Sequence, residues 1–463
     1  MDTRIQHDLV TALPELDLVV DRDVLHGMSH DEAEWAPVGQ PVAALRARST
    51  EDVRRAVRAC ARLGIPVVPR GAGTGLSGGA NATDGCLVLD LSRMNRILEI
   101  DAENLTAVVQ PGVVNDDLKK AVAELGLWYP PDPASSPWST IGGNVATNAG
   151  GLCCLKYGVT RDYVLGLQVV MGGPAGEYGT AVRIGRTTTK GVAGYDLTSL
   201  FVGSEGTFGV ITEITLRLRP VSRTEPRTVV GAFHSLVDAG RAVALCTRRG
   251  LQPAALELLD RACMEAVEEW KHLGLEPDTA ALLLARVDTP GAAEVDALAE
   301  AFTEAGAAWT EQSTDSTEAE ALFAARRLAY PALERLGPVL TEDVCVPRSA
   351  VPAMLARIEE IGARHQVRIA TIAHAGDGNL HPLLLTPSGD DAARLAAQGA
   401  FDDILTAALD LGGTVTGEHG VGLLKRGGME RELGPEVCAL QQAIKHTLDP
   451  LRLFNPTKVV GQL

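Results

Sequence analysis

Three glycine-rich tracts in the first half of the chain, at residues 69–79, 139–151 and 200–218, constrain its fold most strongly. The chain has 48 glycines in 463 residues, and these tracts are locally enriched in them. Glycine lets the backbone approach a ligand where a Cβ would clash, and successive backbone N–H groups can converge on an anion. A flexible or bulged turn would explain one such tract equally well. Three tracts in one region favour a large ligand that carries a pyrophosphate.

The first tract contains a Gly-x-Gly-x-x-Gly pattern, Gly73-Thr-Gly75-Leu-Ser-Gly78, directly after a strand predicted at 65–69. In a Rossmann fold this loop opens a helix, and an acidic residue follows ~20 positions later. Here residues 79–85 cannot start a helix, and Asp90 comes too early. The Rossmann interpretation therefore fails.

Length and periodicity predict two main domains. At ~100–200 residues per domain, a chain of 463 residues makes two or three. We expect a first domain at 1–222, a second at 223–425 and a C-terminal segment at 426–463 that packs back on the first. In the second domain, apolar strands alternate with Ala/Glu/Leu-rich helices, which predicts an α+β domain with an antiparallel sheet. The clearest expected strands are 281–285 and 367–373, and the expected helices are 292–305, 317–329, 349–364 and 391–410.

Charge and cysteine usage exclude several classes of function. The net charge of −17 argues against binding to nucleic acid or an anionic membrane. No apolar run approaches the ~18–20 residues of a membrane-spanning helix, and the N-terminus lacks the features of a signal peptide. The eight cysteines show no metal or iron–sulfur spacing, which indicates reduced thiols in a cytoplasmic protein.

Two short histidine-containing segments predict a metal site. The first is His374-Ala-Gly-Asp-Gly-Asn-Leu-His381, and the second contains Glu418 and His419. A tight turn can bring two imidazoles to one divalent metal, and a carboxylate can complete three protein ligands. We expect His374, His381 and Glu418 to be the ligands of zinc or manganese, with iron also compatible. His419 would then stand beside the metal, free to move a proton.

Several segments together resemble a known family. Residues 69–79, 130–133, 141–151 and 203–207 resemble the FAD-binding domain of flavoenzymes of the vanillyl-alcohol-oxidase type. The segments 374–381 and 417–420 resemble its branch of 2-hydroxyacid dehydrogenases, which includes the glycolate oxidase D-subunit, D-lactate dehydrogenase and D-2-hydroxyglutarate dehydrogenase. The resemblance implies an α+β fold, in which a two-subdomain FAD-binding domain precedes a substrate (cap) domain with an antiparallel sheet. The C-terminal segment returns to the FAD-binding domain.

The resemblance also implies how FAD is held. The first tract would cradle the pyrophosphate, and the other residues would line the rest of the cofactor. No histidine lies between His30 and His234, which excludes a histidyl-linked flavin in this domain and predicts non-covalent FAD. The residues expected to bind the cofactor are Pro69, Arg70, Gly71, Ala72, Gly73, Thr74, Gly75, Leu76, Ser77, Asp132, Pro133, Ser139, Thr140, Gly142, Gly143, Asn144, Asn148, Gly150, Gly151, Glu205, Gly206, Ile211, Asn379 and Asn455.

The implied reaction oxidises a 2-hydroxy acid to a 2-oxo acid. The metal would assist deprotonation of the hydroxyl, His419 would accept the proton, and the hydride would pass from C2 to flavin N5. Arg326 stands where relatives carry an arginine that grips the substrate carboxylate, a task that suits the guanidinium. The alternative is a solvated helix face that Arg326 shares with Glu318 and Glu320. Asp377 is expected to form the turn, and Asn379 to bind flavin or support the metal site.

Two departures from the family pattern bear on the substrate. Enzymes specific for D-2-hydroxyglutarate carry an Asn where this chain has Leu383, and use Thr and Lys where it has Tyr330 and Thr341. A dicarboxylate is therefore disfavoured, and a small or apolar acid such as D-lactate or glycolate is favoured.

Partners are less constrained by the sequence. The electron acceptor stays open among a quinone, a cytochrome and an electron-transfer flavoprotein. The alternative to an independent enzyme is the flavin subunit of a complex with iron–sulfur subunits, peripheral to a membrane. A homodimer is also compatible with the sequence.

Overall fold

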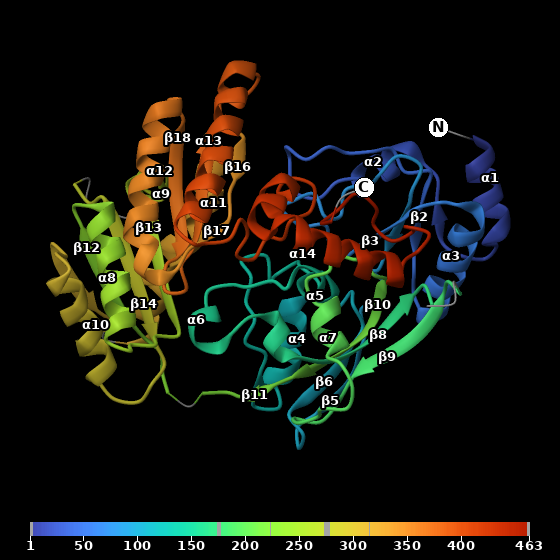
Figure 1. Ribbon diagram of the computed structural model, residues 1–463. Helices are drawn as coiled ribbons and strands as arrows, with labels where there is room; N and C mark the ends of the chain where they lie inside the picture. Colours follow the sequence, from blue (N-terminus) through green and yellow to red (C-terminus); the bar gives the residue numbers. More distant parts are fainter. Residues whose placement is uncertain (1–2, 174–176, 223, 273–277, 314, 461–463) are drawn as a thin grey trace. The chain divides into compact units, whose positions relative to one another are not determined.

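The structure is a computed structural model that describes the chain except for residues 1–2, 174–176, 223, 273–277, 314 and 461–463 (Figure 1). The chain divides into two compact units. Unit 1 contains Met1–Gly150, Val159–Val221 and Glu418–Leu463, and unit 2 contains Gly151–Gly158 and Ser222–Gly417.

The first sheet of unit 1 leads into the first glycine tract. Its strands lie in the order β1 (Leu18–Val19), β2 (Ala43–Arg46), β4 (Leu87–Asp90) and β3 (Val67–Arg70), with β2, β4 and β3 parallel. Helix α3 (Thr50–Leu63) begins at the N-cap Ser49, ends at left-handed Gly64 and buries Val53 and Val57 in the same core as the strands. Strand β3 ends at Arg70, so the glycine tract starts at the edge of a packed layer.

The second sheet of unit 1 is antiparallel. Its strands lie in the order β5 (Ile97–Asp101), β6 (Thr106–Val109), β10 (Val210–Arg217), β8 (Val164–Met171) and β9 (Thr180–Gly185). Helices α4 (Asn115–Ala123) and α5 (Ile141–Thr147) bury Leu118, Ile141 and Val145 in the core that contains Ile214 of β10. The remaining elements of unit 1 are α1 (Thr3–Ala12), α2 (Arg22–Met28), β7 (Leu127–Trp128), η1 (Thr160–Tyr163), α7 (Leu197–Phe201), β11 (Arg219–Pro220) and α14 (Arg426–Leu448).

The C-terminal segment packs within unit 1. Phe454 forms a parallel bridge with Val67 of β3. The fully buried Asp449 accepts hydrogen bonds from the Tyr178 hydroxyl at 2.6 Å and from the backbone N–H groups of Leu453 at 3.0 Å and Phe454 at 2.9 Å. One buried carboxylate therefore holds the turn that returns the chain to the first sheet.

Unit 2 is the predicted α+β domain. Its antiparallel sheet has the order β15 (Trp309–Gln312), β12 (Arg227–Phe233), β14 (Ala281–Val287), β13 (Ala255–Asp260), β18 (Arg368–His374), β19 (Asn379–Leu385) and β16 (Val339–Thr341), and β17 (Val344–Cys345) also pairs with β19. The helical elements of this unit are α6 (Cys154–Tyr157), α8 (Leu236–Arg248), α9 (Arg261–Lys271), α10 (Ala293–Glu304), α11 (Ser316–Glu334), η2 (Arg348–Ala350), α12 (Val351–His365) and α13 (Asp391–Asp410). The central strand β13 is buried along its whole length, so any charged side chain on it must find a partner inside the domain.

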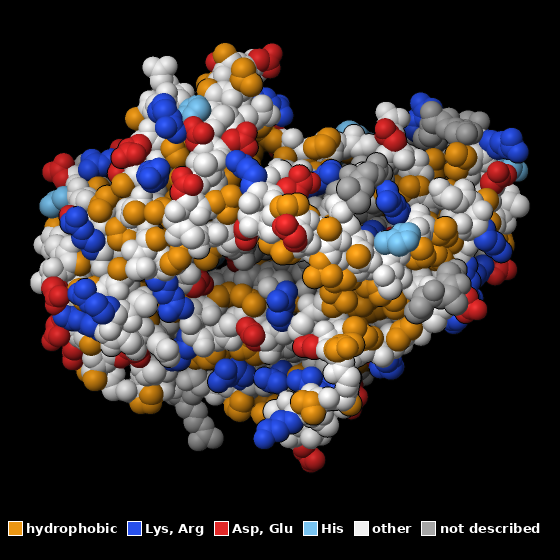
Figure 2. All heavy atoms as spheres, viewed as in Figure 1, with side chains coloured by type: hydrophobic (Ala, Val, Ile, Leu, Met, Phe, Trp, Pro, Cys, Tyr) orange, Lys and Arg blue, Asp and Glu red, His pale blue; other side chains and the backbone are white. Residues whose placement is uncertain are grey.

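The exposed surface shows mixed charge. Over unit 2, the face drawn in Figure 2 intersperses acidic and basic side chains. No helix in the described part of the chain has the length and apolar character needed to span a bilayer.

Candidate functional site

The hairpin of β18 and β19 brings the two predicted metal-binding histidines together. His374 pairs with Asn379, and Ile372 pairs with His381. Opposed residues share a face of the sheet, and so do alternate residues on one strand, so both imidazoles lie on one face. Their ring centroids are 5.2 Å apart. Gly378 in the turn has φ +89°, and a Cβ there would overlap the carbonyl of Val346, so glycine is required for this tight connection.

Glu257 on β13 fixes one of these histidines. Its two carboxylate oxygens lie 2.9 and 3.0 Å from Nδ1 of His374, and its side chain is fully buried. Because a carboxylate at Nδ1 holds the proton there, the lone pair lies on Nε2, the tautomer in which an imidazole can ligate a metal. The same carboxylate accepts a hydrogen bond from Nε of Arg326 at 2.9 Å. Glu257 could have been predicted from the sequence, because it is a lone glutamate within the apolar segment 255–259.

Arg326 is buried on α11, with 9% of its surface exposed. The alternative of a solvated helix face therefore does not describe Arg326. The side chains of Glu318 and Glu320, which that alternative invoked, lie outside the described part of the structure.

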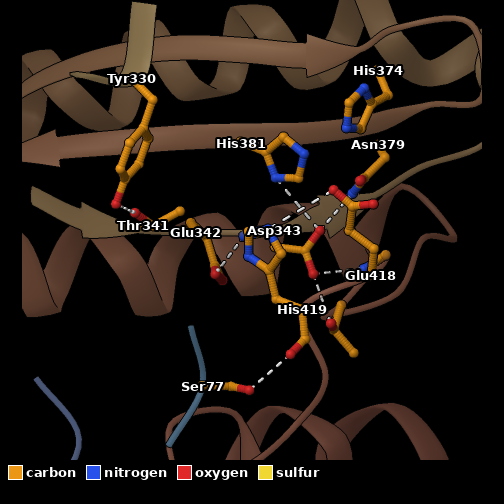
Figure 3. Close-up of polar contacts among 12 residues, drawn as sticks. Ser77, Tyr330, Thr341, Glu342, Asp343, His374, Asn379, His381, Glu418 and His419 are labelled. Carbon is orange, nitrogen blue, oxygen red and sulfur yellow. Dashed lines mark hydrogen bonds and ion pairs between the residues drawn. The ribbon is translucent and has the colours of Figure 1, made fainter. Parts of the chain in front are cut away.

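Asp343 is a second buried carboxylate at this site that the sequence did not predict. Figure 3 shows Asn379 and His381 directed toward it. Asn379 Nδ2 donates to its Oδ1 at 2.7 Å, while the Thr416 hydroxyl at 2.7 Å and the Gly417 N–H at 3.0 Å donate to its Oδ2. Nδ1 of His381 lies 3.6 Å from Oδ1. Asn379 thus supports the carboxylate beside His381, and Asp377 lies in the hairpin turn, as predicted.

Glu418 and His419 belong to unit 1 and begin one residue after Gly417, the last residue of unit 2. Within unit 1, the Ser77 hydroxyl donates to the His419 carbonyl at 2.9 Å (Figure 3). A Cβ on Gly150 would overlap the carboxylate of Glu418. The Glu–His pair is therefore held against residues of two glycine tracts.

The three glycine tracts converge within unit 1. A Cβ built on Gly71 would lie 2.5 Å from Oγ1 of Thr140, which joins the first tract to the second. A Cβ on Gly79 would lie 2.9 Å from Oε2 of Glu205, which joins the first tract to the third. Backbone this close cannot carry side chains, and it leaves the cradle that a pyrophosphate-containing cofactor needs. The residues present therefore fit FAD.

A cavity of about 220 Å³ adjoins this convergence. Its lining includes Ala72 of the first tract, Thr140 of the second and the half-exposed Trp138. At Gly79, the last residue of the first tract, Asn455 donates from Nδ2 to the carbonyl at 2.8 Å, and it also donates to the carbonyl of Glu205 at 2.7 Å. The tail thus braces the same loop that the cavity borders.

The other predicted cofactor residues divide between the units. Gly151 and Asn379 fall in unit 2, and all the others fall in unit 1. Asn144 accepts from Asn115 at 2.9 Å and donates to Ser139 at 3.2 Å, so it stabilises the tract itself. Asn148 ends α5 in a left-handed conformation. Ile211 is buried in the core of the second sheet.

Three buried ionisable side chains, Glu205, Lys458 and Asp31, lie close to the first glycine tract or to the residues that follow it. Glu205 accepts from the N–H groups of Val421 at 2.8 Å and Gly422 at 2.9 Å, and burial raises the pKa of its carboxyl to about 7. Burial likewise lowers the pKa of Lys458 to about 8, and its ammonium donates to the Asn81 carbonyl at 2.6 Å. Burial also raises the pKa of Asp31, whose carboxylate accepts from the Ala33 N–H at 3.0 Å. These groups hold the loop and the segment after His419 in place.

Comparisons with known proteins agree with this architecture. Residues 223–459 match the family described as FAD linked oxidases, C-terminal domain, and residues 41–180 match an FAD binding domain. Glycolate oxidase subunit GlcD of Bacillus subtilis is 43% identical over 91% of this chain and 89% of that protein. D-lactate dehydrogenase of Anaerostipes hadrus is 34% identical over 96% of this chain and 95% of that protein.

A solved structure of p-cresol methylhydroxylase matches 98% of this chain and 96% of that chain with a TM-score of 0.80 and 18% identity, which shows a shared fold. The resemblance to flavoenzymes of the vanillyl-alcohol-oxidase type is thereby confirmed. Because one family match covers half of the sequence and a relative at 43% identity spans most of it, the chain belongs to the FAD-linked oxidases and is an FAD-dependent oxidoreductase.

Proposed function

We propose that this protein oxidises a small or apolar D-2-hydroxy acid, of the D-lactate or glycolate type, to the 2-oxo acid. The observation that carries the proposal is the imidazole pair His374 and His381 on one sheet face, with Glu257 on Nδ1 of His374 and the buried Arg326 beside it. Two imidazoles on one sheet face suit a divalent metal, and the other unit contains most of the match to the FAD binding domain. The names of the relatives, a glycolate oxidase subunit and a D-lactate dehydrogenase, support this substrate class.

The residues that would hold the two groups are distinct. The converging glycine tracts and Asn455 would hold non-covalent FAD, while His374, His381 and Glu418 would ligate zinc or manganese. When bound, the metal would lower the pKa of the substrate hydroxyl and FAD would take the hydride from C2.

His419 would accept the hydroxyl proton. The Ser77 hydroxyl donates to its backbone carbonyl and so fixes the position from which the imidazole extends. A neutral imidazole is suited to receive a proton near neutral pH. Arg326 would bind the substrate carboxylate through the Nη end of its guanidinium, because Nε is committed to Glu257.

Specificity for a monocarboxylate would rest on three positions, Leu383 on β19, Tyr330 on α11 and Thr341 on β16. Leu383 on β19 is fully buried in an apolar cluster. The Tyr330 hydroxyl and Oγ1 of Thr341 are 3.2 Å apart and hydrogen-bonded to each other. These three positions therefore offer no cation to a second carboxylate.

The direct test is anaerobic bleaching of the flavin band near 450 nm (about where oxidised flavins absorb). D-lactate, L-lactate, glycolate and D-2-hydroxyglutarate would be added separately, with and without a chelator. We expect bleaching by D-lactate or glycolate that the chelator abolishes. Flavin that is present but bleached by none of the small acids would contradict the proposed substrate class.

A second candidate function is favoured by one observation, the naming of the relative as a subunit. In that case the chain is the flavin subunit of a glycolate oxidase-like complex, and partners carry the electrons away. Steady turnover of the isolated chain with an artificial dye would argue against this candidate. Bleaching without turnover would support it.

A further inference from the structure

We propose that Glu257 is a positioning residue that sets both the metal affinity of His374 and the carboxylate affinity of Arg326. The inference rests on the proposed function, because it assigns one shared carboxylate to the metal ligand and to the substrate clamp.

The geometry places one anion between two functional groups from separate elements. Leu258 of β13 is paired with Ala373 of β18, so the neighbouring residue Glu257 stands beside His374. Arg326 reaches the same carboxylate from α11, and its Nε lies 2.9 Å from Oε2. Glu257 is 0% exposed, so water does not compete for either bond.

Charge balance explains why both partners are needed. A buried carboxylate is costly unless it is paired and hydrogen-bonded. Arginine is permanently charged and supplies the balancing cation, so the bond to His374 can be made by a neutral imidazole through its Nδ1–H. In that tautomer Nε2 carries the lone pair, which is the form in which an imidazole can ligate a metal.

The same carboxylate aims the guanidinium. With Nε committed to Glu257, the planar group is fixed and its two Nη atoms form the fork that a carboxylate binds in a bidentate manner. Loss of Glu257 would leave Arg326 charged but unanchored. A carboxylate ligand would then bind less tightly even where the metal site is filled.

Asp260 provides a matched control on the same strand. It is a buried carboxylate, 7% exposed, and it accepts from the backbone N–H groups of Cys263 at 2.9 Å and Thr371 at 2.6 Å. It stabilises the same domain without a hydrogen bond to His374 or Arg326. A purely structural role for Glu257 predicts that the two acids behave alike on substitution.

The experiment compares FAD-loaded wild type, Glu257→Gln and Asp260→Asn by two binding measurements. The first is zinc or manganese affinity by chelator competition. The second is the affinity for pyruvate, a 2-oxo monocarboxylate, from its perturbation of the flavin spectrum. We expect Glu257→Gln to weaken metal binding about 10- to 100-fold, as for other groups that orient metal ligands, and to weaken pyruvate binding as well. Asp260→Asn should lower the melting temperature and leave both affinities within about twofold of wild type.

Equal affinities in Glu257→Gln and wild type would overturn the inference, and so would equal losses in both variants. If Glu257→Gln does not fold, Glu257→Asp replaces it, because the shorter carboxylate keeps the charge but cannot reach both partners. Wild-type affinities in Glu257→Asp would equally overturn the inference. A wild-type protein that binds no metal at all would instead contradict the proposed function, so the two failures are distinguishable.

Discussion

At the scale of single residues, Gly150 shows how close the glycine tracts come to the proposed chemistry. The resemblance assigns this residue to the lining of FAD, whereas a Cβ built on it would overlap the carboxylate of Glu418. Its lack of a side chain therefore makes room for a proposed metal ligand. A glycine predicted from a cofactor motif can serve the neighbouring site.

Gly150→Ala is expected to impair metal binding more than flavin binding. The new Cβ would displace the Glu418 carboxylate, so metal affinity and substrate-dependent bleaching should fall at least ~10-fold while the flavin content stays near wild type. Metal affinity by chelator competition, together with flavin absorbance, measures this.

Gly427→Ala is the control for this prediction, because a Cβ there meets nothing within 4 Å. On a helix this change should be neutral or slightly stabilising. Loss of FAD with retained metal affinity in Gly150→Ala would contradict the expectation.

Glu205 predicts a dependence of stability on pH. Burial raises the pKa of its carboxyl from an ordinary 4.5 to about 7. The folded protein therefore binds a proton that the unfolded chain releases, so the contribution to stability is full below pH 4.5 and is lost as the pH rises to about 7.

Glu205→Gln removes this titration. Between about pH 5 and about pH 8, the wild type should lose on the order of 1–3 kcal/mol of unfolding free energy relative to the variant. Denaturant unfolding of both proteins at the two pH values measures the difference. If the difference in unfolding free energy between wild type and Glu205→Gln is the same at both pH values, Glu205 has an ordinary pKa.

Residues with a local pattern could be predicted, and residues defined only by distant partners could not. The pair His374 and His381 lies across a turn marked by two glycines, so the sequence reveals its proximity. Glu257 and His374 are 117 positions apart, and Asp343 and Asn379 are 36 apart. Which buried acid meets which histidine is decided by strand order, and no local pattern encodes that order.

At the scale of elements, the apolar periodicity of unit 2 predicted four of its helices closely and missed α8 (Leu236–Arg248) and α9 (Arg261–Lys271). The helix expected at 391–410 is α13 (Asp391–Asp410), and the one expected at 349–364 is α12 (Val351–His365). The helix expected at 317–329 continues to Glu334 as α11, because Pro331 is accommodated inside it. Tertiary packing of Ala329, Ala332 and Leu333 in the core outweighs the local cost of the proline.

The turn after α14 should be a critical element of unit 1. Asp449→Ala removes the acceptor for Tyr178, Leu453 and Phe454 and leaves Lys445 partly buried without its counter-ion. We expect a loss of ~3–5 kcal/mol in unfolding free energy.

The loss should be accompanied by weaker FAD binding, because Asn455 follows this turn. Denaturant unfolding and flavin release measure the two effects. Asp410→Ala, near the end of α13 in unit 2, is the control and should leave flavin release unchanged. Unaltered flavin release in Asp449→Ala would separate the tail from the cofactor site.

At the scale of the whole molecule, the proposed FAD-binding residues and the two histidines proposed to bind the metal fall mainly in different units, while the third proposed ligand, Glu418, belongs to unit 1. The residues proposed to bind FAD lie almost wholly in unit 1, and both histidines proposed to bind the metal lie in unit 2. Dialysis against a chelator should therefore abolish bleaching by substrate and leave the ratio of flavin to protein unchanged. Zinc or manganese should restore the bleaching. Flavin that leaves together with the metal would contradict this independence.

The chain passes from unit 1 to unit 2 after Gly150 and returns to unit 1 at Val159. This division has a consequence for how relatives can exchange segments in evolution. Unit 2 needs the segment 151–158 as well as 222–417, and Lys156 and Tyr157 of the short segment both bind Asp288 of the long one. Leu155 also fills the space beside Gly376 in the histidine hairpin. A chimera that exchanges only residues 222–417 between relatives would combine the β18–β19 hairpin of one protein with the segment 151–158 of the other. If substrate preference is transferred between relatives by recombination, we therefore expect the segments 151–158 and 222–417 to be transferred together.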